Sequence, residues 1–384
     1  MAENNARKSN SQLFSVYQSA HTTPFSRCLH KSSLRSATPL PLTATGPPPA
    51  PPESPSSQHS EKLDRRRRQA DLMRSAHDIR NSKTPPITGS ASGTAMKKRF
   101  WKSVSVTQEP EGQSAHIIHL DARPVRNPLT NPAQPLQIPA SKPHLATAIA
   151  LEWDHLTSAA QALRAHLIPL TSLAARAQVL EHEDAQSAQA GYARGAGEGQ
   201  GIRYEIMNTL LRYLDTDTLL CWAPEQSSAA TEEGSGLREK QVETAKPILS
   251  FLTQVVWPGV ELVPALSDGS ILPKSQPAAT RAVVKGWMAG LPAWELVGLE
   301  RAALAGKSLS VAARLVAEWS EELRLSNSEE RLTFGVEDAA KACSVEVDWQ
   351  TGRWGEVEDS HDVDKEDLRR QLGAVILLVS GKKC

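Results

Sequence analysis

The sequence predicts an α+β protein, in which a small N-terminal β domain is followed by a C-terminal bundle of α-helices. Two observations lead to this class. Short runs in which apolar and polar residues alternate, separated by turn residues, occupy residues 97–140. From residue 141 to residue 384 the apolar residues recur instead at steps of three and four, the pattern of amphipathic helices. Strands and helices are therefore expected to be segregated along the chain.

The first 52 residues have the composition of a mitochondrial transit peptide. Glu3 is their only acidic residue, whereas they carry five Lys or Arg residues and many Ser and Thr residues. Transit peptides are cationic, rich in hydroxyl groups and poor in acid. A secretory signal would need a continuous apolar stretch, which this segment lacks. A merely disordered tail is the alternative that composition leaves open.

Residues 53–96 are expected to be a disordered linker. This part of the chain completes the Pro- and Ser-rich "PLPLTATGPPPAPPESPSS" and contains "EKLDRRRRQADLMR". Neither stretch can bury enough apolar surface to fold alone. The four consecutive arginines resemble a nuclear-localisation or nucleic-acid-binding patch. No aromatic residue is interleaved with them, so we interpret them as part of a solvated linker.

Two alternating runs and a series of prolines predict the β domain over residues 97–140. The alternating positions are Phe100, Lys102, Val104 and Val106 in the first strand, and His116, Ile118 and Leu120 in the second. The segment "EPEGQ" is expected to connect these strands, and "LDARP" to form a turn made rigid by its proline. Four prolines between residues 128 and 139 remove ladder donors, which predicts edge-like later strands.

The helical bundle is predicted over residues 141–384. Ser141 is the expected N-cap of its first helix, with Pro143 in the first turn. The apolar stripe of this helix consists of Leu145, Ile149, Trp153 and Leu156. Further helices are expected over residues 202–214, 238–256, 280–288, 293–304, 308–323 and 334–347. The last helix is expected over residues 364–379, with Asp364 as its cap.

Charge divides the chain into a basic leader and an acidic body. Residues 1–95 hold 13 Lys or Arg and 6 Asp or Glu residues, whereas the remainder holds 30 and 37. An acidic body argues against binding of nucleic acid, which requires a basic face to neutralise phosphates. It favours a protein partner with positive surface. The longest wholly apolar run, residues 374–379, is far shorter than the roughly 20 residues of a membrane span, so no span is expected.

None of the candidate catalytic motifs has the required residues at the required spacing. In "AGKS", at residues 305–308, the first glycine of a P-loop is replaced by Arg301. The glycines between residues 195 and 201 miss the dinucleotide-binding pattern, because Gln200 occupies its last position. HExxH and GxSxG are absent, and the four cysteines have neither metal nor disulfide spacing. We expect no catalytic residue, no cofactor and no small-molecule substrate.

The best metal candidate is "HDVD", in which His361, Asp362 and Asp364 could ligate a hard or borderline ion. Such a site would make the chain a metal-dependent hydrolase. The alternative is a loop in which Asp364 only caps the last helix. We prefer this alternative and predict no metal site.

Tryptophans beside carboxylates are candidates for binding a partner that has apolar and basic surface. The indole supplies contact area, and the carboxylate supplies orientation. The candidate residues are Glu295, Glu300, Trp354, Glu356, Glu358, Asp359 and Asp362. We prefer the run that begins at Trp354, because its crowded like charges repel one another unless a basic partner neutralises them. For each residue taken alone, core packing or a solvated helix face is the alternative.

Seven stretches resemble, in their order, the mitochondrial F(1) ATP synthase assembly-chaperone family that acts on the alpha subunit. They are "RFWKSVSV", "LDARPVRNP", "LATAIALEWDHL", "IPLTSLA", "LLRYLDTDTLLCWAP", "LVGLERAALAGKSLSVAARL" and "WGEVEDSHDVD". The resemblance implies an N-terminal β domain, a C-terminal orthogonal helical bundle and a location in the mitochondrial matrix. It also implies a non-enzymatic role, in which the chain holds the unassembled alpha subunit.

Two residues of the matching stretches, Trp153 and Pro169, are expected to have structural roles. Trp153 lies on the stripe of the first helix, where a large ring would anchor a junction. The remaining alternative for function is an acidic scaffold of another matrix complex, which would differ in the subunit that co-purifies with it.

The acid-poor leader generates the first prediction. A fusion of residues 1–60 to a fluorescent reporter should accumulate in mitochondria, because its cationic and hydroxylated composition suits import. Fluorescence microscopy of cells that express the fusion checks this expectation. A diffuse cytosolic signal would contradict it.

Overall fold

The computed structural model describes residues 67–71, 73–74, 99–108, 115–130, 132–189, 191, 201–224, 236–266, 272–323, 334–357 and 360–381. The chain divides into two compact units, Met1–Leu63 and Asp64–Cys384, and all described residues belong to the second. The predicted transit peptide therefore lies outside the described residues. Within the predicted linker, residues 67–71 and 73–74 are helical, as their content of good helix formers allows.

The N-terminal sheet is antiparallel and has β2 at its centre. Its strands are β1 (Val104–Gln108), β2 (Ala115–Leu120), β3 (Arg123–Pro124) and β4 (Gln137–Pro139). One edge of β2 pairs with β1, so that Val104 lies opposite Leu120. The other edge pairs with β4 near its start and with β3 at its end. The late strands are short edge strands, as the prolines predict.

The predicted turn after β2 is present, and the side chain of Asp121 stabilises it. Asp121 adopts a left-handed conformation, with φ at 55°. Its carboxylate accepts hydrogen bonds from the backbone N–H of Ser103 at 2.9 Å and of Lys102 at 3.1 Å. These two backbone bonds hold the pKa of Asp121 below its usual value. The turn thereby fixes the start of β1 against the end of β2.

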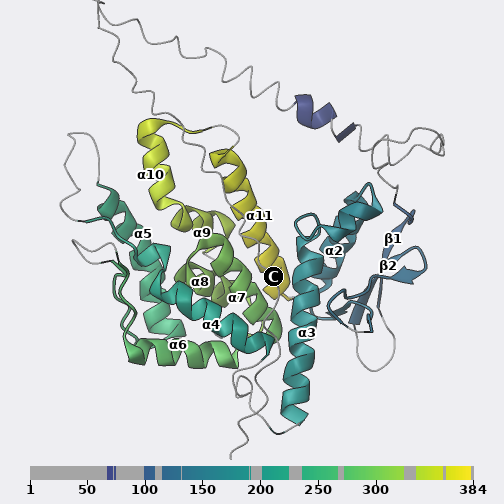
Figure 1. The fold of residues 1–384 in the computed structure, drawn as a ribbon, viewed down its shortest axis with the longest axis horizontal. Coiled ribbons are helices and arrows are strands. Elements are labelled where there is room, and N and C mark those ends of the chain that lie inside the picture. Colours follow the sequence, from purple (N-terminus) through teal and green to yellow (C-terminus); the bar gives the residue numbers. More distant parts are fainter. Residues whose placement is uncertain are drawn as a thin grey trace, which may run out of the picture. The chain divides into compact units, whose positions relative to one another are not determined.

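The regular structure from residue 143 onward is helical (Figure 1). The helices are α2 (Pro143–His155), α3 (Pro169–Gln189), α4 (Ile202–Asp215), α5 (Leu237–Phe251), α6 (Ala278–Gly290), α7 (Ala293–Gly306), α8 (Leu309–Trp319), α9 (Val336–Cys343), α10 (Val345–Trp354) and α11 (His361–Val379). Short helical segments are η1 (Ala159–Leu163), η2 (Thr218–Leu220) and the π-type η4 (Leu252–Val256). The α+β class, with a small β domain before a helical bundle, is confirmed.

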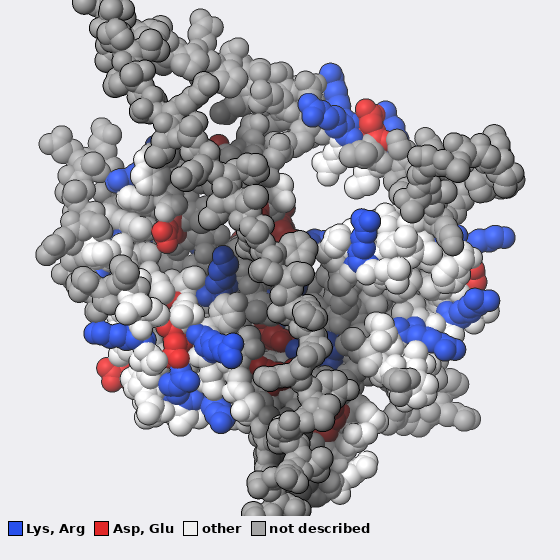
Figure 2. Space-filling view, viewed as in Figure 1, with Lys and Arg blue, Asp and Glu red and all other residues white. Residues whose placement is uncertain are grey.

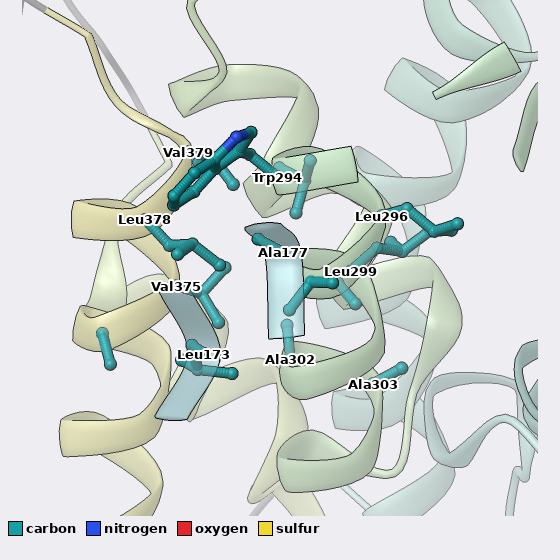
Figure 3. Packing of buried hydrophobic residues seen from close by; sticks show 14 of the residues in the cluster. Leu173, Ala177, Trp294, Leu296, Leu299, Ala302, Ala303, Val375, Leu378 and Val379 are labelled. Atoms are coloured by element: carbon teal, nitrogen blue, oxygen red, sulfur yellow. The ribbon is translucent and has the colours of Figure 1, made fainter. Parts of the chain in front are cut away.

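The core of the bundle forms around α7, which packs against α3, α4, α8 and α11. Figure 3 shows side chains of α3, α7 and α11 converging, among them Leu173, Leu299 and Val375. Gly298 permits the close approach of α7 and α11, because a Cβ at this position would lie 2.7 Å from the Val379 side chain. The packing therefore requires a glycine there.

The predicted helices differ from the structure at two places. No helix was among those predicted over residues 169–189, where the structure has α3. Much of the buried face of α3 is alanine, at positions 174, 175 and 177, so its sequence carries a weak apolar stripe. The stretch 334–347, predicted as one helix, is divided at Ser344, whose ψ of 9° ends α9 before α10 begins. Neither difference alters the order of the elements.

Both predicted N-caps are displaced. Lys142, not Ser141, occupies the N-cap position of α2, and its ammonium donates to the Val379 carbonyl at 3.1 Å. The last helix begins at His361, so Ser360 is its N-cap residue and Asp364 lies inside the first turns. Asp364 does not cap the helix, but its negative charge interacts favourably with the positive end of the helix dipole.

The junction between α2 and α3 is built by consecutive side chains near the end of α2. Glu152 accepts hydrogen bonds from the backbone N–H groups of Leu170, at 2.7 Å, and Thr171, at 3.0 Å. These N–H groups belong to the first turn of α3, where no partner within the helix exists. Pro169 begins that helix and has no N–H to satisfy. Glu152 thus caps a neighbouring helix.

Trp153 connects the same junction to the β domain. Its indole N–H donates to the Thr171 hydroxyl at 3.0 Å. Its ring packs edge-to-face on Trp101, with centroids 5.5 Å apart. The next residue, Asp154, pairs with Arg99 at 3.2 Å. The sheet and the helices consequently form one compact unit.

Replacing Trp153 with Arg should lower the free energy of unfolding by roughly 2–3 kcal/mol, because a half-buried ring and its hydrogen bond are lost. Trp153→Phe keeps the ring contact with Trp101 and loses only the hydrogen bond, so its cost should be about 1 kcal/mol. Denaturant unfolding of the three proteins measures both values. A wild-type midpoint for Trp153→Arg would contradict the assigned junction.

Candidate partner-binding site

Exposed apolar side chains gather where α10 leads into α11. Trp354 is 74% exposed, Val357 61% and Val363 55%. Large apolar side chains that lie together and exposed on a surface often mark an interaction site. We call the surface formed by Trp354, Glu356, Val357, Asp362 and Val363 the α10–α11 face.

The connection between the two helices is a defined turn. Gly355 ends α10 with φ at 87°, a conformation that favours glycine. Val357 and His361 then bond to each other twice. The Val357 N–H donates to Nδ1 of His361 at 3.0 Å, and the His361 N–H donates to the Val357 carbonyl at 3.1 Å. This pair keeps Val357 beside the first turn of α11.

Lys365 organises the acidic residues of this region. Its ammonium lies 2.7 Å from Glu356 and 3.3 Å from Asp348, so it links α10, the turn and α11. The hydrogen bond from Lys365 holds the pKa of Glu356 below its usual value, and the pKa of Lys365 is raised in return. Glu356 therefore stays ionised, and its position is fixed.

The aromatic side chains of α10 support one another instead of entering the core. None of the residues of α10, all of which are described, is buried. Trp349 and Trp354 meet at 88°, with ring centroids 6.1 Å apart. The Arg353 guanidinium lies 4.0 Å from the centroid of Trp349. An aromatic surface is thus held open to solvent on a short helix.

The remaining predicted acidic residues of this segment have different positions. Asp362 is half-buried and Asp364 is exposed, and both lie in the first turn of α11. Both carboxylates lie near the positive end of the helix dipole, where a negative charge stabilises the helix. Glu358 and Asp359 lie outside the described residues, so their role stays a prediction.

Glu295 is not on the surface, contrary to the expectation from sequence. It is 1% exposed, within the first turn of α7, and accepts a hydrogen bond from the Ser320 hydroxyl at 3.1 Å. Burial raises the pKa of this carboxyl, and the nearby charge of Lys142 opposes the rise. A partner could not reach Glu295 without opening the core. Its neighbour Trp294 is buried as well.

Glu300 is only partly accessible and is already paired. Its two carboxylate oxygens lie 2.7 and 2.8 Å from Nε and Nη2 of Arg176. This bidentate pair joins α7 to α3. The structure therefore brings Trp354, Glu356 and Asp362 together, and separates Glu295 and Glu300 from them.

A pocket of about 650 Å³ lies behind the α10–α11 face, between these helices and the end of α7. Cys343 and His361 are among the residues that line it. Burial raises the pKa of Cys343 to about 12, so its thiol is protonated at neutral pH and is a poor nucleophile. Nδ1 of His361 already accepts a hydrogen bond from Val357.

The described residues support neither a metal site nor a membrane-spanning helix. Within these ranges, no group of three or more His, Cys, Asp and Glu side chains is placed to hold a metal ion. No described helix is long and apolar enough to cross a membrane. On the face that Figure 2 shows, the described Lys and Arg residues are scattered and form no continuous basic patch.

Comparison with known proteins identifies the family. A family model described as "ATP12 chaperone protein" matches residues 98–253. The chain is 30% identical to "Protein atp12, mitochondrial" of Schizosaccharomyces pombe over 282 residues, which are 73% of this chain and 81% of that protein. It is also 30% identical to "Protein ATP12, mitochondrial" of Saccharomyces cerevisiae, covering 75% of this chain and 85% of that protein. The chain belongs to the ATP12 family.

The crystal structure of Atp12 from Paracoccus denitrificans is 22% identical, with a TM-score of 0.45 over 73% of this chain and 98% of that one. As an ATP12-family member the chain is a chaperone and not an enzyme. The metal-dependent hydrolase that "HDVD" suggested is therefore not retained. Both yeast relatives are named as mitochondrial proteins, and this ATP12 chain is mitochondrial too.

The sequence analysis missed Val357 and Val363 of the α10–α11 face, and also Lys365, which organises its acidic residues. The two valines could have been noticed as apolar residues inside an acidic run, and Lys365 as the cation that follows that run. The pairing of Trp349 with Trp354 had no comparable signal, because it depends on the break at Ser344 that starts α10.

The different burial of two acidic residues generates a stability prediction. Glu295→Lys should cost about 3 kcal/mol or more, because it places a second positive charge in the core beside Lys142. Glu356→Lys should cost about 1 kcal/mol or less, since it only loses an exposed pair with Lys365. Thermal and denaturant unfolding of both variants tests this difference. Equal costs would mean that Glu295 is not buried as described.

Proposed function

We propose that this ATP12-family chain binds the unassembled alpha subunit of the F(1) sector of mitochondrial ATP synthase, in the matrix, and delivers it to the growing complex. A role in ATP synthase assembly follows from membership of the family. The alpha subunit as client, and the matrix as compartment, are the further step. Seven sequence stretches that resemble chaperones of the alpha subunit support this step.

The exposure of the α10–α11 face is the observation that carries the proposal. Trp354, Val357 and Val363 offer apolar area, and Glu356 and Asp362 lie among them. A surface of this kind suits a client that has apolar residues next to basic ones. Because Glu356 is held by Lys365 before any client arrives, little ordering is required on binding.

A holding chaperone of this kind works by mass action. A free subunit exposes the surface that its partner subunits later cover, and such surface promotes aggregation. Reversible binding lowers the free concentration of the aggregating form. The larger native interface can then displace the chaperone, and no hydrolysis of nucleotide is required.

A pull-down from a mitochondrial matrix extract, with the tagged mature chain as bait, tests the client. The alpha subunit should be the F(1) component that is enriched over a mock bait. Enrichment of a subunit of another complex, without the alpha subunit, would favour the acidic-scaffold alternative and contradict the proposal.

Charge reversal in the acidic run that follows Trp354 should weaken capture of the client. The variant Glu356→Lys with Glu358→Lys removes attraction to a basic surface, so capture of the alpha subunit should fall, more strongly at low salt than at high salt. Quantitative pull-down over a range of salt concentrations measures this effect.

A matched control is Glu205→Lys with Glu261→Lys, which makes the same charge change on two exposed residues elsewhere. The control should retain capture, and both variants should remain folded at the temperature of the assay. If the test variant stays folded and captures the client normally at every salt concentration, the α10–α11 face is not the client-binding surface.

A further inference from the structure

The two helices that carry the α10–α11 face are held by different parts of the bundle. The helix α10 packs against α5, whereas α11 packs mainly against α7 and α9. Both helices are described over their whole length; α10 has no buried residue, and α11 has none before Leu372. Next to the face, neither helix therefore anchors the other through a shared apolar core.

A cavity lies between the two helices in place of packed side chains. It is the pocket of about 650 Å³ behind the α10–α11 face, which α10 lines with Val345, Glu346 and Val347 and α11 lines with His361 and Leu368. Close-packed side chains fix the spacing of two helices, whereas a hollow does not. The spacing of α10 and α11 therefore depends on groups that reach from one helix to the other.

Lys365 is such a group. It lies in the second turn of α11 and lines the pocket. Its ammonium lies 3.3 Å from Asp348 of α10 and 2.7 Å from Glu356 of the turn. Lys365 and Asp348 also line a smaller cavity, of about 340 Å³, beside α9. The charged bridge between α10 and α11 thus lies between two hollow regions.

The other contacts of this region act over shorter spans. The paired hydrogen bonds of Val357 and His361 fix the turn to the start of α11. The contact between Trp349 and Trp354 lies within α10 itself. Lys365 adds the connection from α11 to the body of α10, and so links the helix that carries Trp354 to the helix that carries Val363.

We propose that Lys365 is a positioning residue for client capture, which holds Trp354 of α10 and Val363 of α11 at the spacing that the surface of the client requires. The inference rests on the proposed function, because the client is the unassembled alpha subunit. A bridge that is formed before binding restricts the face, so less conformational freedom is lost when the client binds. Lys365 acts through Asp348 and Glu356 and does not touch the client.

A purely electrostatic role of Lys365 would have the opposite effect. Its ammonium neutralises part of the acidic surface, and in that account it weakens the attraction to a basic client. Removal of the charge would then strengthen capture. Removal of a positioning residue weakens capture, even though the surface becomes more acidic. The sign of the change therefore distinguishes the two roles.

The variant Lys365→Met removes the charge and keeps an unbranched side chain. Its capture of the alpha subunit, measured by quantitative pull-down, should fall about five- to tenfold, the effect expected when two charged contacts that order a surface are lost. Lys365→Arg can still bridge both carboxylates and should retain most of the capture.

The matched control is Lys285→Met, which makes the same charge change at an exposed lysine of α6. It should capture the alpha subunit like the wild type. Exposed ion pairs contribute little to global stability, so all three variants should stay folded, which circular dichroism checks.

A distance measurement tests the positioning role without the client. Spin labels are introduced as non-natural amino acids at Gly352 of α10 and Glu366 of α11. A side chain at Gly352 meets no atom within 4 Å, and Glu366 is exposed, so both positions accept a label. Pulsed electron paramagnetic resonance should show a narrow distance distribution in the chain with Lys365. The distribution should broaden or shift in Lys365→Met and be restored in Lys365→Arg.

The outcomes separate the inference from the proposed function. Capture at or above the wild-type level by folded Lys365→Met would overturn the inference and leave the proposed function intact. Weaker capture with an unchanged distance distribution would overturn it as well, because Lys365 would then contact the client directly. Failure of the wild-type chain to capture the alpha subunit would contradict the proposed function, and the inference with it.

Discussion

The fold depends on the hydrogen bonds that the backbone N–H groups in the first turn of α3 make away from water. The N–H groups at the start of a helix lack partners within it, and here they face another helix instead of solvent. Glu152 supplies the missing acceptors. Burial raises the pKa of this carboxyl, and the N–H groups of Leu170 and Thr171 oppose the rise. Since α3 also packs on α7, the same contact links the sheet to the centre of the bundle.

The two ends of α11 are anchored very differently. Its C-terminal half packs on α7 around Gly298, and the Val379 carbonyl accepts a hydrogen bond from Lys142. Its N-terminal half contains no buried residue before Leu372 among those described. A helix fixed in the core at one end can present its other end to a partner without loss of stability. The part of the α10–α11 face that α11 contributes is thus carried by a helix anchored in the core at its other end.

The order of the elements could be predicted from the sequence, because alternation and helical periodicity report burial of whole faces. What the sequence could not supply depends on small residues and on tertiary partners. Much of the buried face of α3 is alanine, so this face does not stand out in the sequence as an apolar stripe. Ser344 ends a helix that the apolar periodicity alone would continue. Glu295 resembles Glu356 as an acid close to tryptophan, yet only its neighbours in space, Ser320 and Lys142, explain its burial. Trp354 and Glu356 could be singled out because a tryptophan and several acids follow one another in the sequence.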